Sequence, residues 1–168
     1  SFAGLQNHLA YDSFDCGRAG TGYVNLYNGD VVIARPLTQC GGNRMPVSIT
    51  AYYGAQLFGV TARVGSHWRL SCDQCMTKSY INDELYFIWS KVDGSQHYFR
   101  KPNSSAAYYE DLSGLSLKLT DNGTYTAIED KGGTVMRFES PQDALDDTGR
   151  LLSITDSCGN TNTFQYGD

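Results

Sequence analysis

Charged residues are scarce in this sequence, and neither sign forms a cluster. They make up 18% of the 168 residues and give a net charge of −5. Because no stripe of basic residues is present to follow phosphates, we expect no nucleic-acid partner. No stretch is long and apolar enough to span a bilayer, so we also expect no membrane insertion. Ser1 to Gly4 do not form a signal peptide, and this abrupt start favours a fragment of a longer polypeptide.

Motifs that frame a catalytic nucleophile are also absent. The residues that could pair as nucleophile and base are Cys40, Cys72, Cys75, His67 and His97. No G-x-S-x-G, H-E-x-x-H or similar motif surrounds any of them. We therefore predict no enzyme activity, no catalytic residue and no cofactor.

The cysteines are too few for a disulfide scaffold in a chain of this length, and their odd number leaves at least one unpaired. They are Cys16, Cys40, Cys72, Cys75 and Cys158. If a hairpin turns at Asn28-Gly29, Cys16 and Cys40 lie about equally far from the turn and could form a cross-strand disulfide. With Cys72 and Cys75, which have C-x-x-C spacing, they could instead bind zinc through four thiolates. We prefer one disulfide plus free thiols, with Cys158 an exposed free thiol.

Strand and turn sequences alternate along most of the chain. The clearest hairpin is Tyr23–Tyr27, the turn Asn28–Asp30 and Val31–Arg35, since Asn-Gly adopts the positive φ angles of a type I′ turn. Pro36 should end the second strand because it has no N–H donor. Further strands are predicted over 46–53, 68–72, 84–92, 96–100, 115–119, 124–129, 134–138, 150–155 and 161–166. This spacing predicts an all-β fold, an antiparallel meander of hairpins, with at most one short helix at 141–147.

Two segments in the second half of the chain have the same pattern. Ile128 to Phe138 and Ile154 to Phe164 both fit I-x-D-x-x-G-x-x-x-x-F, displaced by 26 residues. We predict that Ile ends a strand, that Asp accepts hydrogen bonds within the turn, and that Gly takes a positive φ. The Phe then packs across the returning strand. Repetition of such hairpins extends a sheet, and each unit buries its face on the next.

Residues 149–168 resemble one full YD repeat, the repeat of bacterial Rhs proteins. The family pattern is G-[RK]-L-x-x-[IV]-x-D-x-x-G-N-x-x-x-[FY]-x-Y, followed closely by Asp. This chain fills its positions with Gly149, Arg150, Leu151, Ile154, Asp156, Gly159, Asn160, Phe164 and Tyr166. It departs from the pattern at Cys158, where small polar residues are usual, and at Gly167, inserted before the final Asp.

The preceding residues resemble the segment before the repeats in the same proteins. Gly20–Asn25 is similar to its opening hairpin, Met45–Ile49 to an LPVS strand, and Gly65–Leu70 to a GWRL strand. We therefore divide the chain into an irregular segment (1–19), a pre-repeat β-domain (20–148) and a YD repeat (149–168).

The resemblance implies a large exported bacterial polypeptide, related in repeat architecture to the teneurin adhesion proteins. Repeats of this family wind into a hollow β-shell, which in toxin members encloses a C-terminal effector. For this chain the resemblance implies a secreted or cell-surface, non-catalytic module that starts or caps such a shell. Its partners would be further YD repeats of the parent polypeptide. The strand near Phe164–Tyr166 would be an open sheet edge prone to self-association.

Abundant aromatic residues leave a glycan-binding surface module as an alternative function. The sequence has twelve Tyr, seven Phe and two Trp. Carbohydrate modules stack sugars on planar aromatics of a β-face, whereas alternating aromatics on strands are more often cross-strand packing. The residues that could form a stacking platform are Tyr52, Trp68, Trp89 and Tyr109. A third alternative, a zinc-dependent or thiol enzyme, needs Cys72 and Cys75 to lie near further ligands or a histidine.

Overall fold

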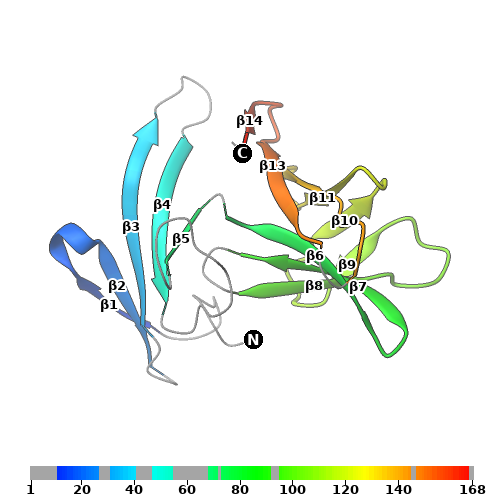
Figure 1. Ribbon diagram of the computed structural model, residues 1–168, viewed down its shortest axis with the longest axis horizontal. Coiled ribbons are helices and arrows are strands. Elements are labelled where there is room, and N and C mark those ends of the chain that lie inside the picture. Colours follow the sequence, from blue (N-terminus) through cyan, green and yellow to red (C-terminus); the bar gives the residue numbers. More distant parts are fainter. Residues whose placement is uncertain are drawn as a thin grey trace. The chain divides into compact units, whose positions relative to one another are not determined.

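The structure, a computed structural model, describes residues 11–26, 31–40, 47–54, 68–71, 73–91, 95–144 and 147–166. Antiparallel strands dominate it, with a single 3-10 turn, η1 (Gly17–Ala19), among the described residues, and the predicted all-β fold is confirmed. The chain forms two compact units, Ser1–Asp73 with Lys91–Ser95, and Gln74–Ser90 with Gln96–Asp168. Each unit is described by itself (Figure 1).

The first unit contains a five-stranded antiparallel sheet whose strands follow one another in chain order. They are β1 (Tyr11–Asp15), β2 (Thr21–Asn25), β3 (Val31–Cys40), β4 (Val47–Gly54) and β5 (Trp68–Leu70). β2 and β3 form the predicted hairpin, with Val24 opposite Val31; its turn residues 28–30 lie outside the described residues. Figure 1 shows β3 and β4, the longest strands of this sheet, side by side.

Pro36 does not end β3, contrary to the prediction. The strand continues to Cys40, and its register against β4 shifts between Pro36 and Thr38. A bulge accommodates a residue that has no N–H donor, because the ladder is locally interrupted there.

The described part of the second unit contains nine strands, eight of which close into a ring. They are β6 (Cys75–Ile81), β7 (Glu84–Ser90), β8 (Gln96–Arg100), β9 (Tyr109–Asp111), β10 (Lys118–Asp121), β11 (Tyr125–Glu129), β12 (Val135–Glu139), β13 (Gly149–Thr155) and β14 (Thr161–Thr163). Consecutive strands pair from β6 to β12, and β13 closes the ring by pairing with both β12 and β6. β14 pairs with the far end of β13 and is the last strand in the sheet order.

One hydrophobic core fills the ring. Along β7, buried Phe87 and Trp89 alternate with half-buried side chains, as the two-residue period of a strand requires. Side chains from six other ring strands and from the segment before β10 join them in a single cluster. Its buried members are Met76, Phe87, Trp89, Phe99, Leu117, Leu119, Ile128, Phe138 and Leu151.

Two segment predictions are wrong. The segment expected to be irregular, 1–19, contains β1, whose side chains are mostly exposed and therefore show no apolar alternation. The described residues of 141–147 form no helix. There the N–H of Gln142 donates to the carboxylate of Asp147, which satisfies the backbone in a loop.

The boundaries of two other segments also differ from the prediction. β10 begins at Lys118 rather than at residue 115, because Ser116 has a φ of 55°, outside the range of a strand. The expected domain boundary between 148 and 149 does not separate the two units, because β13 is hydrogen-bonded to β12 and β6.

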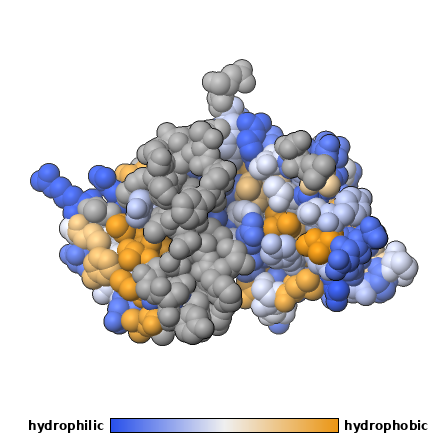
Figure 2. Space-filling model, turned by 60° about the horizontal axis from the view of Figure 1, so that its bottom comes forward, coloured by the Kyte–Doolittle hydropathy of each residue, from blue (hydrophilic) through white to orange (hydrophobic). Residues whose placement is uncertain are grey.

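Apolar side chains also reach the surface of both units. On the coloured parts of the face drawn in Figure 2, hydrophobic areas lie beside hydrophilic ones. Among the described residues, the exposed large apolar ones are Phe14, Leu26 and Leu37 in the first unit and Tyr80, Ile81, Leu112 and Leu115 in the second. Within the described ranges, no helix has the length and hydropathy to cross a bilayer.

Candidate functional site

The turn after β11 is closed by Asp130. The Asp130 N–H donates to the Thr134 carbonyl at 3.1 Å, and the Gly133 N–H donates to the Asp130 carbonyl at 3.2 Å. The Asp130 carboxylate accepts from the Thr134 N–H at 2.9 Å, and Gly133 has a φ of 83°. The aspartate thus accepts within the turn and the glycine takes the left-handed position, as the sequence predicts.

The turn after β13 has the same bonds around Asp156. The Asp156 N–H donates to the Asn160 carbonyl at 2.9 Å, and the Gly159 N–H donates to the Asp156 carbonyl at 3.0 Å. The carboxylate accepts from the backbone N–H of Asn160 at 2.8 Å and from its side-chain amide at 2.7 Å. These bonds, above all the one from the Asn160 side chain, lower the pKa of Asp156. With Gly159 at a φ of 85°, the two copies found in the sequence form the same turn.

The two turns lie next to each other. A Cβ placed on Gly133 would be 3.3 Å from the Cβ of Ser157 in the second turn. β12, which leaves the first turn, pairs with β13, which enters the second, with Val135 opposite Thr155. The second copy is therefore added to the sheet directly beside the first.

The equivalent apolar side chains of the two copies differ in burial. Ile128 and Phe138 of the first copy are 1% and 0% exposed. Ile154 and Phe164 of the second copy are only partly buried, although both pack against the same core. The apolar side chains of the first copy are covered by the second copy, which is its neighbour in the sheet. Those of the second copy are less completely covered by the residues that the structure describes.

Gly149 and Arg150 hold the start of β13 against β12. A Cβ at Gly149 would lie 1.8 Å from the carbonyl oxygen of Glu139, so no larger residue fits there. The Arg150 guanidinium donates to both carboxylate oxygens of Glu139, at 3.1 and 2.9 Å, and these bonds lower the pKa of Glu139. The same guanidinium lies 4.8 Å from the Tyr166 ring centroid, and the Tyr166 hydroxyl donates to the Leu151 carbonyl at 2.7 Å. Arg150 and Leu151, from the start of the YD-repeat pattern, are thus in contact with Tyr166 from its end.

No protein-family model and no curated protein matches this chain. The repeated turn is therefore defined by the chain's own sequence and geometry.

Cys16 lies between β1 and β2, and its thiol is free. The predicted disulfide from Cys16 to Cys40 is wrong for this structure. The ladder between β2 and β3 ends at Thr21 opposite Ala34, so Cys16 does not continue β2 toward Cys40. Instead the Cys16 N–H donates to the Gly20 carbonyl at 2.8 Å within the turn.

The four-thiolate zinc site stays a prediction. Cys72 and the side chain of Cys40 lie outside the described residues, and Cys16 and Cys75 belong to different units. Among the residues that the structure does describe, no three His, Cys, Asp or Glu side chains are placed to bind a metal. Cys158 is an exposed free thiol, as predicted.

Trp89 cannot serve as a stacking platform, and its assignment to one is wrong. Its side chain is in the core and only 7% exposed. Its indole N–H donates to the Gln74 side-chain oxygen at 3.1 Å, and its ring lies 5.1 Å from the His97 ring. The side chains of Tyr52 and Trp68 lie outside the described residues.

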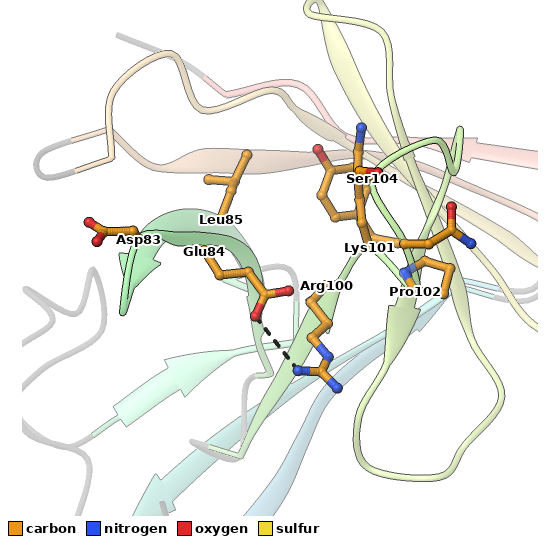
Figure 3. A pocket seen from close by; sticks show the side chains of 9 residues that line it. Asp83, Glu84, Leu85, Arg100, Lys101, Pro102 and Ser104 are labelled. Carbon is orange, nitrogen blue, oxygen red and sulfur yellow. Dashed lines mark ion pairs between the residues drawn. The ribbon is translucent and has the colours of Figure 1, made fainter.

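Tyr109, the remaining residue of the predicted platform, lines a groove that the sequence did not reveal. The groove is formed by residues 83–85, residues 100–104 and Tyr109, and has a volume of about 560 Å³ (Figure 3). The Tyr109 ring packs edge-on against Phe87, with centroids 4.9 Å apart. Burial, and then the negative charge of Asp121, raise the pKa of Tyr109, so its hydroxyl keeps its proton at neutral pH.

Serine, histidine and aspartate side chains also meet at one point of the second unit. The Ser113 hydroxyl donates to the Asp111 carboxylate and lies 2.7 Å from Nδ1 of His97. A nucleophilic serine directs its proton to the imidazole, whereas here the proton is directed to the carboxylate. The Asp111 side chain is fully buried and also accepts from the N–H groups of Ser113 and Leu115, at 3.1 and 2.9 Å. This cluster therefore fixes the loop between β9 and β10.

Proposed function

We propose that this chain is a non-catalytic structural module of a large exported bacterial YD-repeat protein, secreted or displayed at the cell surface. In that role it starts or caps a shell of repeated hairpins, and its partners are further repeats of the same polypeptide. The observation that carries the proposal is the unequal burial of the two copies of the Asp…Gly hairpin.

In a repeat array each unit buries its apolar face on the next one. Phe138 of the first copy is fully buried where the second copy pairs beside it. Phe164, at the equivalent position of the second copy, is only partly buried. A further hairpin beside β14 would give Phe164 and Ile154 the burial that Phe138 and Ile128 already have. Each such side chain contributes about 1 kcal/mol when its remaining exposure is removed.

The backbone of β14 also supports this role. The Phe164 N–H donates to the Leu152 carbonyl of β13 at 2.9 Å. Because N–H groups alternate between the two sides of a strand, the Thr163 N–H points away from β13. β14 has no second neighbour among the described strands. Its outer side therefore carries backbone groups of the kind that pair with an added strand.

The test is to append a third copy, residues 149–166 repeated after Asp168, and to measure urea unfolding. We expect the free energy of unfolding to rise by about 1–3 kcal/mol. The matched control carries the same appended segment with its two turn residues, the equivalents of Asp156 and Gly159, changed to alanine. An equal gain in the control, or no gain in either protein, would contradict the proposal.

A second variant separates strand addition from a general effect of a longer chain. Thr163→Pro removes an N–H on the outer side of β14 and leaves the bonds to β13 in place. It should change the parent by less than about 0.5 kcal/mol. In the extended protein it should abolish the gain, because the appended strand loses its hydrogen-bond donor.

A further inference from the structure

The groove beside Tyr109 lies at one end of the ring, where two connections of the second unit meet the ends of their strands. Asp83 lies in the turn between β6 and β7, and Glu84 and Leu85 begin β7; Arg100 ends β8, and residues 101–104 follow it. Figure 3 shows Glu84 and Arg100 pointing toward each other on one side, with Lys101, Pro102 and Ser104 on the other. Its volume of about 560 Å³ falls within the range of small-molecule sites, which often occupy the ends of closed sheets.

Several polar groups of the groove have partners within the protein before any ligand binds. Asp83 has a φ of 63° in a tight turn, and the Glu84 carboxylate lies 3.6 Å from the Arg100 guanidinium. The Asn103 amide oxygen accepts from the N–H of Ser105 at 3.1 Å and from its hydroxyl at 2.8 Å. These bonds use only the oxygen of the Asn103 side chain, so its two N–H donors remain for a ligand. Such preorganisation lowers the entropic cost of binding a ligand.

The charges of the groove cancel. Its lining contains two acidic residues, Asp83 and Glu84, and two basic ones, Arg100 and Lys101. A phosphate or sulfate would meet the carboxylates, and an amine would meet the cations, so either ion is disfavoured. A neutral ligand with many hydroxyl groups can instead donate to the carboxylates and accept from the guanidinium and the ammonium.

Tyr109 adds a partly apolar wall to these hydrogen-bonding groups. Its ring is half-buried and fixed by the contact with Phe87, and the Lys101 ammonium lies 5.6 Å from its centroid. Lys101 is exposed, so its side chain can move aside and leave the ring to the C–H face of a sugar. We propose that this groove binds a neutral saccharide, with Arg100 and Asn103 donating to its hydroxyl groups and Tyr109 packing against its ring.

The experiment uses the full chain and an array of neutral oligomers of glucose, galactose, mannose and N-acetylglucosamine, with sulfated and sialylated glycans beside them. The best neutral glycan is then titrated by calorimetry against the parent and three variants. Arg100→Ala and Asn103→Ala should each weaken binding at least tenfold, because each removes a donor to the sugar. Arg137→Ala is the matched control, since Arg137 is an exposed arginine whose guanidinium lies over Tyr125, outside the groove lining; its affinity should not change.

Three outcomes would overturn the proposal. They are no neutral glycan bound at millimolar concentration, binding of sulfated or sialylated glycans alone, and neutral binding that survives both Arg100→Ala and Asn103→Ala. Circular dichroism of each variant shows that it is folded. None of these outcomes affects the proposed structural role, because the groove shares no residue with the two repeated turns.

Discussion

Replacement of Gly149 by alanine should be one of the most damaging small changes available in this chain. The new methyl group would lie 1.8 Å from the Glu139 carbonyl oxygen and 2.8 Å from its carbonyl carbon, both backbone atoms. β12 and β13 would have to separate by more than 1 Å at the point where Gly149 also pairs with Met76 to close the ring. About two hydrogen bonds at roughly 1 kcal/mol each, plus about 1–3 kcal/mol of overpacking, give an expected loss of about 3–5 kcal/mol.

The assay is urea unfolding followed by tryptophan fluorescence. In a Trp68→Phe background Trp89 is the only tryptophan, and it lies in the core of the ring. Gly132→Ala is the control, because its new methyl group meets only the Asp130 side chain, at 3.3 Å. We expect that control to lose less than about 1 kcal/mol. If Gly149→Ala stays within 1 kcal/mol of the parent, the argument that only glycine fits between the strands is refuted.

Three further changes have defined outcomes. Because Arg150 lowers the pKa of Glu139, the stability from this pair is present above the ordinary carboxyl pKa and is lost as the pH falls through the lowered one. Unfolding measured between about pH 5 and pH 3 should therefore depend less on pH in Glu139→Gln than in the parent. Asp156→Ala should lower the urea midpoint more than Asp156→Asn, which keeps an oxygen acceptor for the turn; equal losses would contradict this. Thr126→Val should stabilise the protein by about 1 kcal/mol in thermal or urea unfolding, because the buried Thr126 hydroxyl has no hydrogen-bond partner in the described structure; a loss of stability would show that the hydroxyl is satisfied.

The sequence predicted best the elements whose turns require particular residues. The hairpin after Asp130 and the one after Asp156 were found because aspartate and glycine stand at fixed positions. The hairpin between β6 and β7 was missed because its turn contains no glycine: Asn82 and Asp83 take the positive φ angles, 51° and 63°. β1 was missed because it is exposed along nearly its whole length.

Closure of the ring could not be predicted from sequence patterns. It depends on the pairing of Gly149 with Met76 and of Arg150 with Cys75, residues more than 70 positions apart. No local pattern specifies such a contact. The groove has the same origin, since Asp83 and Lys101 come together only through the pairing of β7 with β8. Trp89 was wrongly assigned to the aromatic platform because alternation alone did not tell which side of β7 would face the core.

β13 forms hydrogen bonds with three strands, and this arrangement determines whether further strands can be added to the sheet. β12 pairs along one side of it, through Val135 to Phe138. On the other side, residues 149–150 pair with β6 and residues 153–155 pair with β14. The start of β13 therefore closes the ring by pairing with β6. The rest of β13 extends beyond β6 and pairs with β14, so the sheet continues past the closed ring. Strands added after β14 would extend the sheet without breaking any hydrogen bond of the closed ring. Closure of the ring and addition of further strands are therefore compatible.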